Sequence, residues 1–183
     1  MKMICYLSRM NIKGFLRTIL ILLILSINIG CDQVSKTIVR HKMNDYSYVS
    51  FLNNHVTLSK VENSGAFLSM GDSLSKPAKM VVLNIIPMLA IAFGLFFVLT
   101  RTNITGLTLI ALVMILGGGV GNLYDRMVHG SVTDFMHVNF GIFQTGIFNV
   151  ADLSITFGVF ILLMLNFFKK KADLEPIPDS TEL

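Results

Sequence analysis

The sequence predicts an all-α membrane protein, folded as a bundle of four transmembrane helices. Of its 183 residues, 53% are hydrophobic and only 14% are charged, whereas ordinary soluble domains have about 25% charged residues. A soluble protein this apolar would expose large hydrophobic patches to water. Four apolar segments each approach the roughly 20 residues that cross a hydrocarbon core. Helices are the expected form for them, because a helix satisfies its own backbone hydrogen bonds within lipid.

The expected spans are residues 14–32, 80–100, 104–123 and 147–168. The helical pattern of the first span extends to about Val39, and the second contains Pro87, which membrane helices tolerate as a kink. Only residues 101–103 separate the second and third spans, which predicts a tight turn there. Residues 14–168 are therefore predicted to form one domain, flanked by a short basic segment, 1–13, and a charged tail, 169–183.

Two long polar loops, residues 33–79 and 124–146, connect the remaining spans. In the first loop, residues 48–51 and 55–58 have the composition of short strands and are separated by Asn53 and Asn54. Lys and Arg divide almost evenly between the two sides of the bundle, eight against seven. Because the positive-inside rule is read mainly on short segments, we expect both termini in the cytoplasm and both long loops outside.

The net charge of +4 does not indicate a nucleic-acid-binding protein, because the basic residues lie mainly beside the apolar segments. The two cysteines, Cys5 and Cys31, belong to no CxxC or Cys/His cluster. His129 and His137 lack the HExxH spacing of a zinc site. We therefore expect no metal, no cofactor and no nucleic acid.

Polar residues gather at those ends of the spans that should face outward, and we expect them to lie close together. Asp152 is the most telling, because it stands five positions inside an apolar span, about 7.5 Å below its start at about 1.5 Å per residue. A carboxylate there costs a few kcal/mol and is a functional candidate. A structural Asp152, paired with Arg126 or bonded to Asn149, is the alternative.

Asp134 lies in the second outer loop, where a solvated or helix-capping role is the simplest interpretation. Its significance rises when it is paired with Asp152. Two carboxylates brought together in a site of low dielectric share one proton and titrate in two separate steps. The charged member can accept a proton from water while the neutral member protonates an amide, so the pair predicts peptide hydrolysis.

Five short motifs occur in order along the four spans: residues 32–36 (Asp-Gln-Val-Ser-Lys), 63–67 (Asn-Ser-Gly-Ala-Phe), 121–126 (Gly-Asn-Leu-Tyr-Asp-Arg), 130–135 (Gly-Ser-Val-Thr-Asp-Phe) and 148–152 (Phe-Asn-Val-Ala-Asp). Each is weak alone, but together they resemble the lipoprotein signal peptidase (signal peptidase II) family. The resemblance implies that Asp134 and Asp152 form the catalytic dyad. It implies that other motif residues bind substrate or support the site: Asp32, Lys36, Asn63, Gly65, Asn122, Asp125, Arg126, Asn149 and Ala151.

The resemblance also implies a small extracytoplasmic β-cradle and a short periplasmic helix near residues 64–75. The expected substrate is a prolipoprotein whose cysteine carries a diacylglyceryl group, cut just before that cysteine. The enzyme would lie in the bacterial inner membrane among membrane lipids, with its site at the extracytoplasmic face. Inhibition by cyclic peptides such as globomycin is expected on the same ground.

Two other functions remain open from the residues alone. A small transporter or channel could use Asp152, Asp32 and Arg126 along a polar path, although internal repeats would then be expected. The chain could instead be a non-catalytic membrane scaffold, or a lipoprotein attached through Cys31. Residues 1–31 resemble a secretory signal, with a basic start and an apolar run that ends at Gly30 and Cys31.

Overall fold

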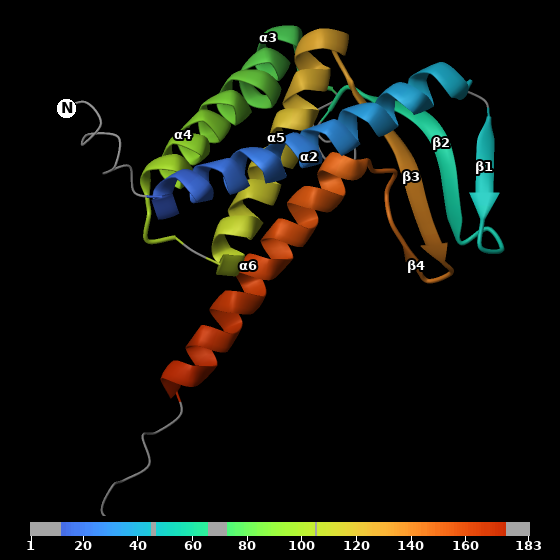
Figure 1. Cartoon of the computed structure of the whole chain (residues 1–183). Helices are drawn as coiled ribbons and strands as arrows, with labels where there is room; N and C mark the ends of the chain where they lie inside the picture. Colours follow the sequence, from blue (N-terminus) through green and yellow to red (C-terminus); the bar gives the residue numbers. More distant parts are fainter. Residues whose placement is uncertain (1–11, 45–46, 66–72, 105, 175–183) are drawn as a thin grey trace, which may run out of the picture.

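The computed structural model describes residues 12–44, 47–65, 73–104 and 106–174. Within these residues, four helical segments are long and apolar enough to cross a membrane, as predicted: Gly14–Lys42, Lys76–Thr100, Gly106–His129 and Val150–Phe168. They belong to helices α2 (Ile12–Lys42), α3 (Lys76–Lys79), η2 (Met80–Ile85), α4 (Ile86–Thr100), α5 (Gly106–His129) and α6 (Val150–Leu174) (Figure 1).

The first helix, α2, continues past residue 32, where the membrane span was predicted to end, and past Val39, to which its helical pattern was expected to extend. It has 31 residues, so at about 1.5 Å per residue it is about 46 Å long, whereas a hydrocarbon core is about 30 Å thick. Asp32 and Lys36 are fully buried in this extension. The extension therefore stays helical because its polar residues face the other helices, and residues 33–42 are not loop.

The second span is one continuous helical segment with an irregular start. Its residues Met80–Ile85 form a π-helix, directly before Pro87 in the first turn of α4. Proline has no backbone N–H and its ring crowds the carbonyl four residues earlier, here that of Leu83. A wider π turn at this point accommodates the missing hydrogen bond.

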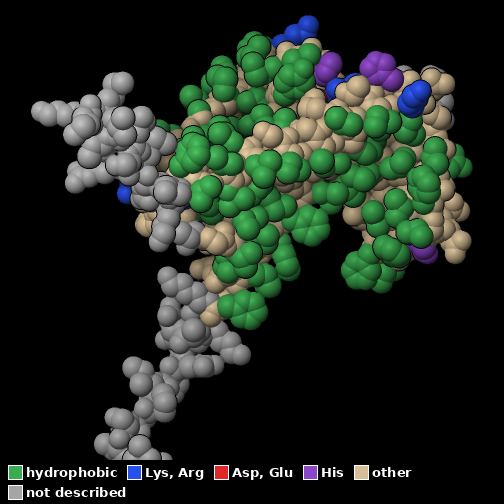
Figure 2. All heavy atoms as spheres, viewed as in Figure 1, with side chains coloured by type: hydrophobic (Ala, Val, Ile, Leu, Met, Phe, Trp, Pro, Cys, Tyr) green, Lys and Arg blue, Asp and Glu red, His purple; other side chains and the backbone are tan. Residues whose placement is uncertain are grey.

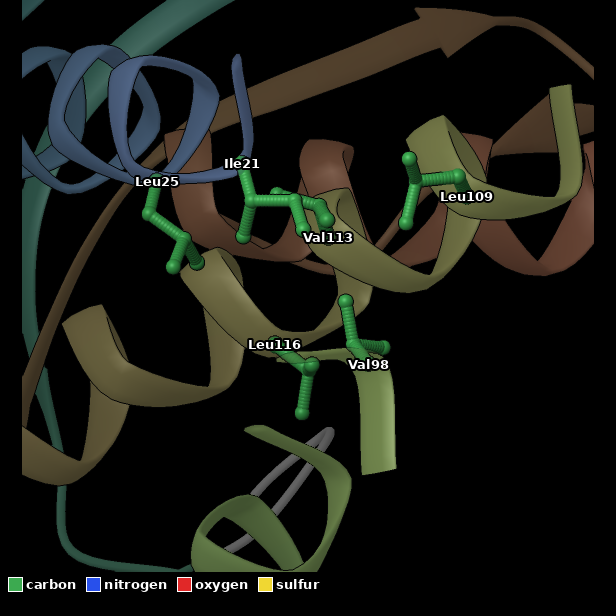
Figure 3. Close-up of a cluster of buried hydrophobic side chains, with 6 residues drawn as sticks. All are labelled: Ile21, Leu25, Val98, Leu109, Val113 and Leu116. Atoms are coloured by element: carbon green, nitrogen blue, oxygen red, sulfur yellow. The ribbon is translucent and has the colours of Figure 1, made fainter. Parts of the chain in front are cut away.

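Helix α5 is the inner helix of the bundle and packs against α6, α2 and α4. Half of its apolar window is buried, against 11–17% for the other spans. The buried cluster in Figure 3 joins Ile21 and Leu25 of α2 to Val98 of α4 and to three α5 side chains, Leu109, Val113 and Leu116. The other helices turn large apolar side chains outward, as lipid contact requires.

Glycines on α5 allow this close packing. A Cβ at Gly118 would clash with the carbonyl oxygen of Ala151 at the start of α6, and one at Gly121 would clash with the carboxylate of Asp32 on α2. Small residues at helix contacts let backbones approach closely in membrane proteins. Gly118 and Gly121 therefore allow α6 and α2 to approach α5 closely, next to the site described below.

At the opposite end of the bundle, Arg17 ties α2 to the end of α4. Its guanidinium donates hydrogen bonds to the carbonyl oxygens of Val98 and Arg101, both at 2.8 Å. The last carbonyls of a helix have no partner within the helix, and a cationic side chain is well suited to satisfy them. This contact anchors the beginning of α2 beside the turn between α4 and α5.

A four-stranded antiparallel sheet, in the order β1-β2-β3-β4, lies beside the helices (Figure 1). Its strands are β1 (Tyr48–Phe51), β2 (Val56–Asn63), β3 (Val132–Phe140) and β4 (Phe143–Gln144). The strands predicted in the first loop are present, and β2 extends beyond residue 58. The interpretation of residues 124–146 as loop was wrong, because α5 continues to His129 and β3 and β4 follow it.

The fourth span begins later than predicted, at Val150 rather than residue 147. Asp152 is therefore in the first turn of α6, and not five positions inside it. The covering helix expected near residues 64–75 falls largely on residues outside the described part of the chain. Figure 2 shows hydrophobic side chains over the helices, with basic and histidine side chains mainly along the upper edge.

Candidate active site

The predicted site residues come together where the ends of α2 and α5 meet the start of α6 and the sheet. Asp134 lies on β3 with only 4% of its surface exposed. Asp152 reaches the same region from the first turn of α6. Strand β3 enters directly after α5 and α6 follows directly after β4, so short connections hold both aspartates in place.

Two asparagines hold the carboxylate of Asp134. The Nδ2 of Asn63 donates to its Oδ2 at 2.9 Å, and the Nδ2 of Asn149 donates to its Oδ1 at 2.6 Å. Asn63 is the last residue of β2, and its own Oδ1 accepts a hydrogen bond from the backbone N–H of Gly65 at 3.0 Å. Both carboxylate oxygens of Asp134 therefore have a neutral donor.

Asp152 is held by Asn122 and by the cap of its own helix. The Nδ2 of Asn122 donates to Oδ1 of Asp152 at 2.8 Å. The backbone N–H of Asn149 donates to Oδ2 at 3.2 Å, while the N–H of Asp152 donates to Oδ1 of Asn149 at 2.9 Å. This reciprocal pair is a capping box, with Asn149 before the first turn of α6 and Asp152 three residues later.

Asn149 is the residue that connects the two aspartates. Its side chain donates to Asp134 and its backbone donates to Asp152. The same Nδ2 also lies 3.2 Å from Oδ1 of Asn122. The ion pair considered between Asp152 and Arg126 does not occur among the described residues, whereas the alternative bond to Asn149 does.

A fully buried lysine supports this arrangement from α2. Lys36 Nζ lies 2.8 Å from Asp32 and 3.0 Å from Asp125, and it donates to Oδ1 of Asn122 at 2.9 Å. An ammonium has three N–H donors, and each therefore has an oxygen to bind. A buried charge is tolerated only when it is paired and hydrogen-bonded in this way.

Asp32 and Arg126 attach further backbone segments to the site. Oδ1 of Asp32 accepts the N–H of Ala151 at 2.9 Å, which satisfies a free donor at the start of α6. Arg126 donates to the carbonyl oxygen of Gly65 at 2.9 Å and lies 3.4 Å from that of Asn122. Gly65 and Ala151 thus take part through their backbones, which their sequence motifs could not show.

Burial raises the pKa of Asp134 to about 6, from 3.8 in water. Removing a carboxylate from water disfavours its charged form, and the nearby charge of Asp152 acts in the same direction. The hydrogen bonds from Asn63 and Asn149 oppose the shift but do not cancel it. A carboxyl with such a pKa can exchange a proton close to neutral pH.

An open pocket of about 390 Å³ adjoins Asp152. It is formed by the start of α6 and the connection from β4, and its lining is mostly apolar. Phe148, Leu153 and Thr156 are among the lining residues. A substrate with an apolar portion could therefore reach one carboxylate of the pair without crossing the bundle.

Two supporting residues were not predicted, Arg40 and Thr133. Arg40 lies 3.0 Å from Asp125 and donates through Nε to the hydroxyl of Thr133 at 2.8 Å. The signal for Arg40 was its spacing, since Asp32, Lys36 and Arg40 recur every four residues and so share one helical face. It was overlooked because the helical pattern was expected to end at about Val39. Thr133 carried no signal, because its role depends on a strand that was read as loop.

Comparison with known proteins identifies the family of the chain. The sequence profile of the Signal peptidase (SPase) II family matches residues 21–168. A lipoprotein signal peptidase of Clostridioides difficile is 34% identical over 155 residues, which cover 84% of this chain and 99% of that protein. A lipoprotein signal peptidase of Borrelia turicatae is also 34% identical, over 80% of this chain and 88% of that protein.

A solved structure described as a bacterial membrane enzyme superposes with a TM-score of 0.73 at 25% identity, covering 86% of this chain and 92% of that one. The likeness thus extends over the helices and the sheet together. The family match spans the segments that carry both aspartates and their asparagine partners. The chain therefore belongs to the signal peptidase II family, the multi-pass membrane proteases of aspartic type that remove signal peptides from prolipoproteins.

Proposed function

We propose that Asp134 and Asp152 are the catalytic dyad with which this chain cuts prolipoproteins. The observation that carries the proposal is the bridge through Asn149, whose side chain binds one carboxylate and whose backbone binds the other. Neutral amides hold both acids without neutralising either of them. The remaining predicted residues then act as supports: Asp32, Lys36, Asn63, Gly65, Asn122, Asp125, Arg126 and Ala151.

In the proposed reaction, one carboxylate is ionised and the other holds the shared proton. The ionised group accepts a proton from a water molecule as its oxygen attacks the carbonyl carbon of the scissile amide. The neutral group then donates its proton to the amide nitrogen as the carbon–nitrogen bond breaks. Because burial raises its pKa to about 6, Asp134 is the better candidate for the group that holds the proton.

The proposed substrate is a prolipoprotein whose cysteine carries a diacylglyceryl group, cut just before that cysteine. The apolar pocket beside Asp152 supports this choice, because acyl chains and the reacting amide would lie next to each other. Globomycin-type cyclic peptides are expected to compete for the same site. Lys and Arg on the short segments support a location in the inner membrane, with both termini cytoplasmic and the dyad at the extracytoplasmic face.

The test uses the purified variants Asp134→Asn and Asp152→Asn beside the wild type. Each is incubated with a diacylglyceryl-modified prolipoprotein, and loss of the signal peptide is followed by gel shift. We expect each variant to lose cleavage by several orders of magnitude, because each lacks one of the two groups that would transfer protons. Tyr48→Phe is the control, since it changes a single polar atom of an exposed side chain on the same sheet.

Circular dichroism and detergent size-exclusion profiles show whether each variant is folded. A folded Asp134→Asn or Asp152→Asn protein with near-normal cleavage would make that aspartate structural. A folded wild type that never cuts the substrate would contradict the proposed reaction. The transporter and scaffold alternatives would then be favoured.

A further inference from the structure

Two hairpin tips of the sheet carry large apolar side chains with no protein contact to bury them. The tip patch consists of Phe51 and Leu52 between β1 and β2, and of Phe140, Ile142 and Phe143 between β3 and β4. Ile142 is 91% exposed, Phe143 75% and Leu52 72%. Groups this apolar at the end of a polar loop require a partner other than water.

The two tips form one surface. The backbone N–H of Asn139 donates to the carbonyl oxygen of His55 at 2.8 Å. The Nδ1 of His55 lies 2.8 Å from the carbonyl oxygen of Asn139, and its ring stacks on Phe140 with the centroids 4.8 Å apart. These contacts hold the first hairpin against the second, so the five side chains of the tip patch lie on one end of the sheet.

Charge is absent from this end of the sheet. Residues 46–59 and 135–151 contain no Asp, Glu, Lys or Arg, although both segments run through turns, where charged residues are usual. The charged residues of the sheet, Lys60, Glu62 and Asp134, all lie toward the opposite end. A surface exposed only to water has no reason to sort its charges in this way.

The tip patch points toward the side on which the helices run. The paired strands β2 and β3 reach from the ends of α2 and α5 to the tips, and in Figure 1 β3 and α6 both descend from the top of the bundle, β3 to the right and α6 to the left. Figure 2 shows hydrophobic side chains both on the spanning helices and on the lower edge of the sheet. The pocket beside Asp152 lies between them, because residues 144–148 and α6 line it.

We propose that the tip patch inserts into the lipid leaflet on the dyad side of the membrane and serves as a second anchor. The occupant is lipid because the patch is uncharged, aromatic and continuous in direction with the lipid-facing helices. Aromatic and large apolar side chains are favoured at the boundary between headgroups and acyl chains. The inference rests on the chain spanning a membrane, and not on the proposed peptidase dyad.

Such an anchor fixes the depth of the sheet. Strand β3 carries Asp134 near one end and Phe140 at the other, so a tip held in lipid sets how far Asp134 stands from the acyl region. The mostly apolar pocket beside Asp152, which residues 144–148 and α6 line, would then lie close to the acyl region. A lipid-modified substrate could enter from the leaflet in which it already lies.

The chain contains no tryptophan, so single tryptophans report without background. The full-length variants Ile142→Trp and Leu52→Trp are reconstituted in phosphatidylcholine/phosphatidylglycerol vesicles that contain chain-brominated phosphatidylcholine. Phe160→Trp, on the exposed face of α6, is the lipid control. His41→Trp, on the exposed last turn of α2, is the aqueous control, because that turn lies beyond the length a bilayer needs.

We expect bromine to quench Ile142→Trp and Leu52→Trp as strongly as the lipid control and at least about twofold more than the aqueous control, as for side chains at the acyl boundary. Quenching of either reporter by aqueous iodide at the level of His41→Trp would place that tip in water and overturn the proposal. Protection from both quenchers would also overturn it, because a second protein surface would then cover the patch.

Discussion

At the scale of single residues, neutral amide side chains contact both aspartates, and a buried lysine contacts one of these amides. Asn122 stands between Lys36 and Asp152, accepting a hydrogen bond from the first and donating one to the second. An ammonium in direct contact with Asp152 would fix that carboxylate in its charged form. An intervening amide orients the acid without placing a positive charge directly against it.

The raised pKa of Asp134 makes stability depend on pH in a specific window. Its value rises from 3.8 to about 6 in the fold, so the folded state binds the proton more tightly than the unfolded state does. The free energy of unfolding should therefore fall as pH rises from about 4 to about 6, by up to about 3 kcal/mol at about 1.4 kcal/mol per pKa unit. We expect the Tm of the wild type to decline across this window relative to that of Asp134→Asn, in parallel thermal scans. Parallel Tm curves for the two proteins would contradict the raised pKa.

At the scale of elements, the contact between α5 and α6 determines where Asp152 stands. Gly118 lies against the backbone of Ala151, one residue before Asp152. The Asp32 carboxylate binds the N–H of the same Ala151 from α2. Three helices therefore converge on the first turn of α6, and their spacing there leaves no room for a methyl group.

Gly118→Ala should therefore push α6 away from α5. We expect a lower Tm and weaker cleavage, because overpacking typically costs about 1–3 kcal/mol. Gly30→Ala is the matched control, a glycine inside α2 whose added Cβ meets nothing within 4 Å. Its Tm should stay unchanged or rise slightly, because alanine favours a helix by up to about 1 kcal/mol over glycine. Equal Tm values and equal cleavage for the two variants would show that the close contact at Gly118 does not limit the packing of α5 against α6.

The number of spans and most of the site could be predicted from the sequence, but the ends of elements could not. Hydropathy identifies a span by its apolar residues, so it ended α2 where Asp32 begins a polar stretch. Lys36 and Arg40 stay helical because they pair with Asp125 on α5, a contact that local sequence does not contain. Strand β3 was missed for the same reason, since its pairing partner β2 lies about 70 residues earlier.

At the scale of the whole molecule, four spans place both ends of the domain on one side of the membrane. In the proposed orientation, which rests on the basic residues of the short segments, that side is the cytoplasm. The dyad, the sheet and the end of α2 then share the outer side. Both aspartates then lie at the same face of the bundle, opposite the turn between α4 and α5.

Labelling of single cysteines tests this orientation. In a background with Cys5 and Cys31 replaced by Ser, His41→Cys marks the dyad side and Thr102→Cys marks the turn between α4 and α5. Both positions are exposed. A membrane-impermeant maleimide should label His41→Cys in intact spheroplasts, and Thr102→Cys only after permeabilisation. The reverse pattern would invert the proposed orientation.

Helix α2 is held by contacts near both of its ends, although its sequence resembles the segments that the family removes from its substrates. This N-terminal helix has the basic start, apolar run and Gly30-Cys31 pair of a leader sequence, the kind of segment that the family releases. Here the chain does not unwind at that cysteine but continues as helix to Lys42, held by Arg17 near one end and by Asp32 and Lys36 near the other. The bond before Cys31 is thus locked inside regular helical structure. The leader-like segment of this chain is thus an integral helix of its folded domain.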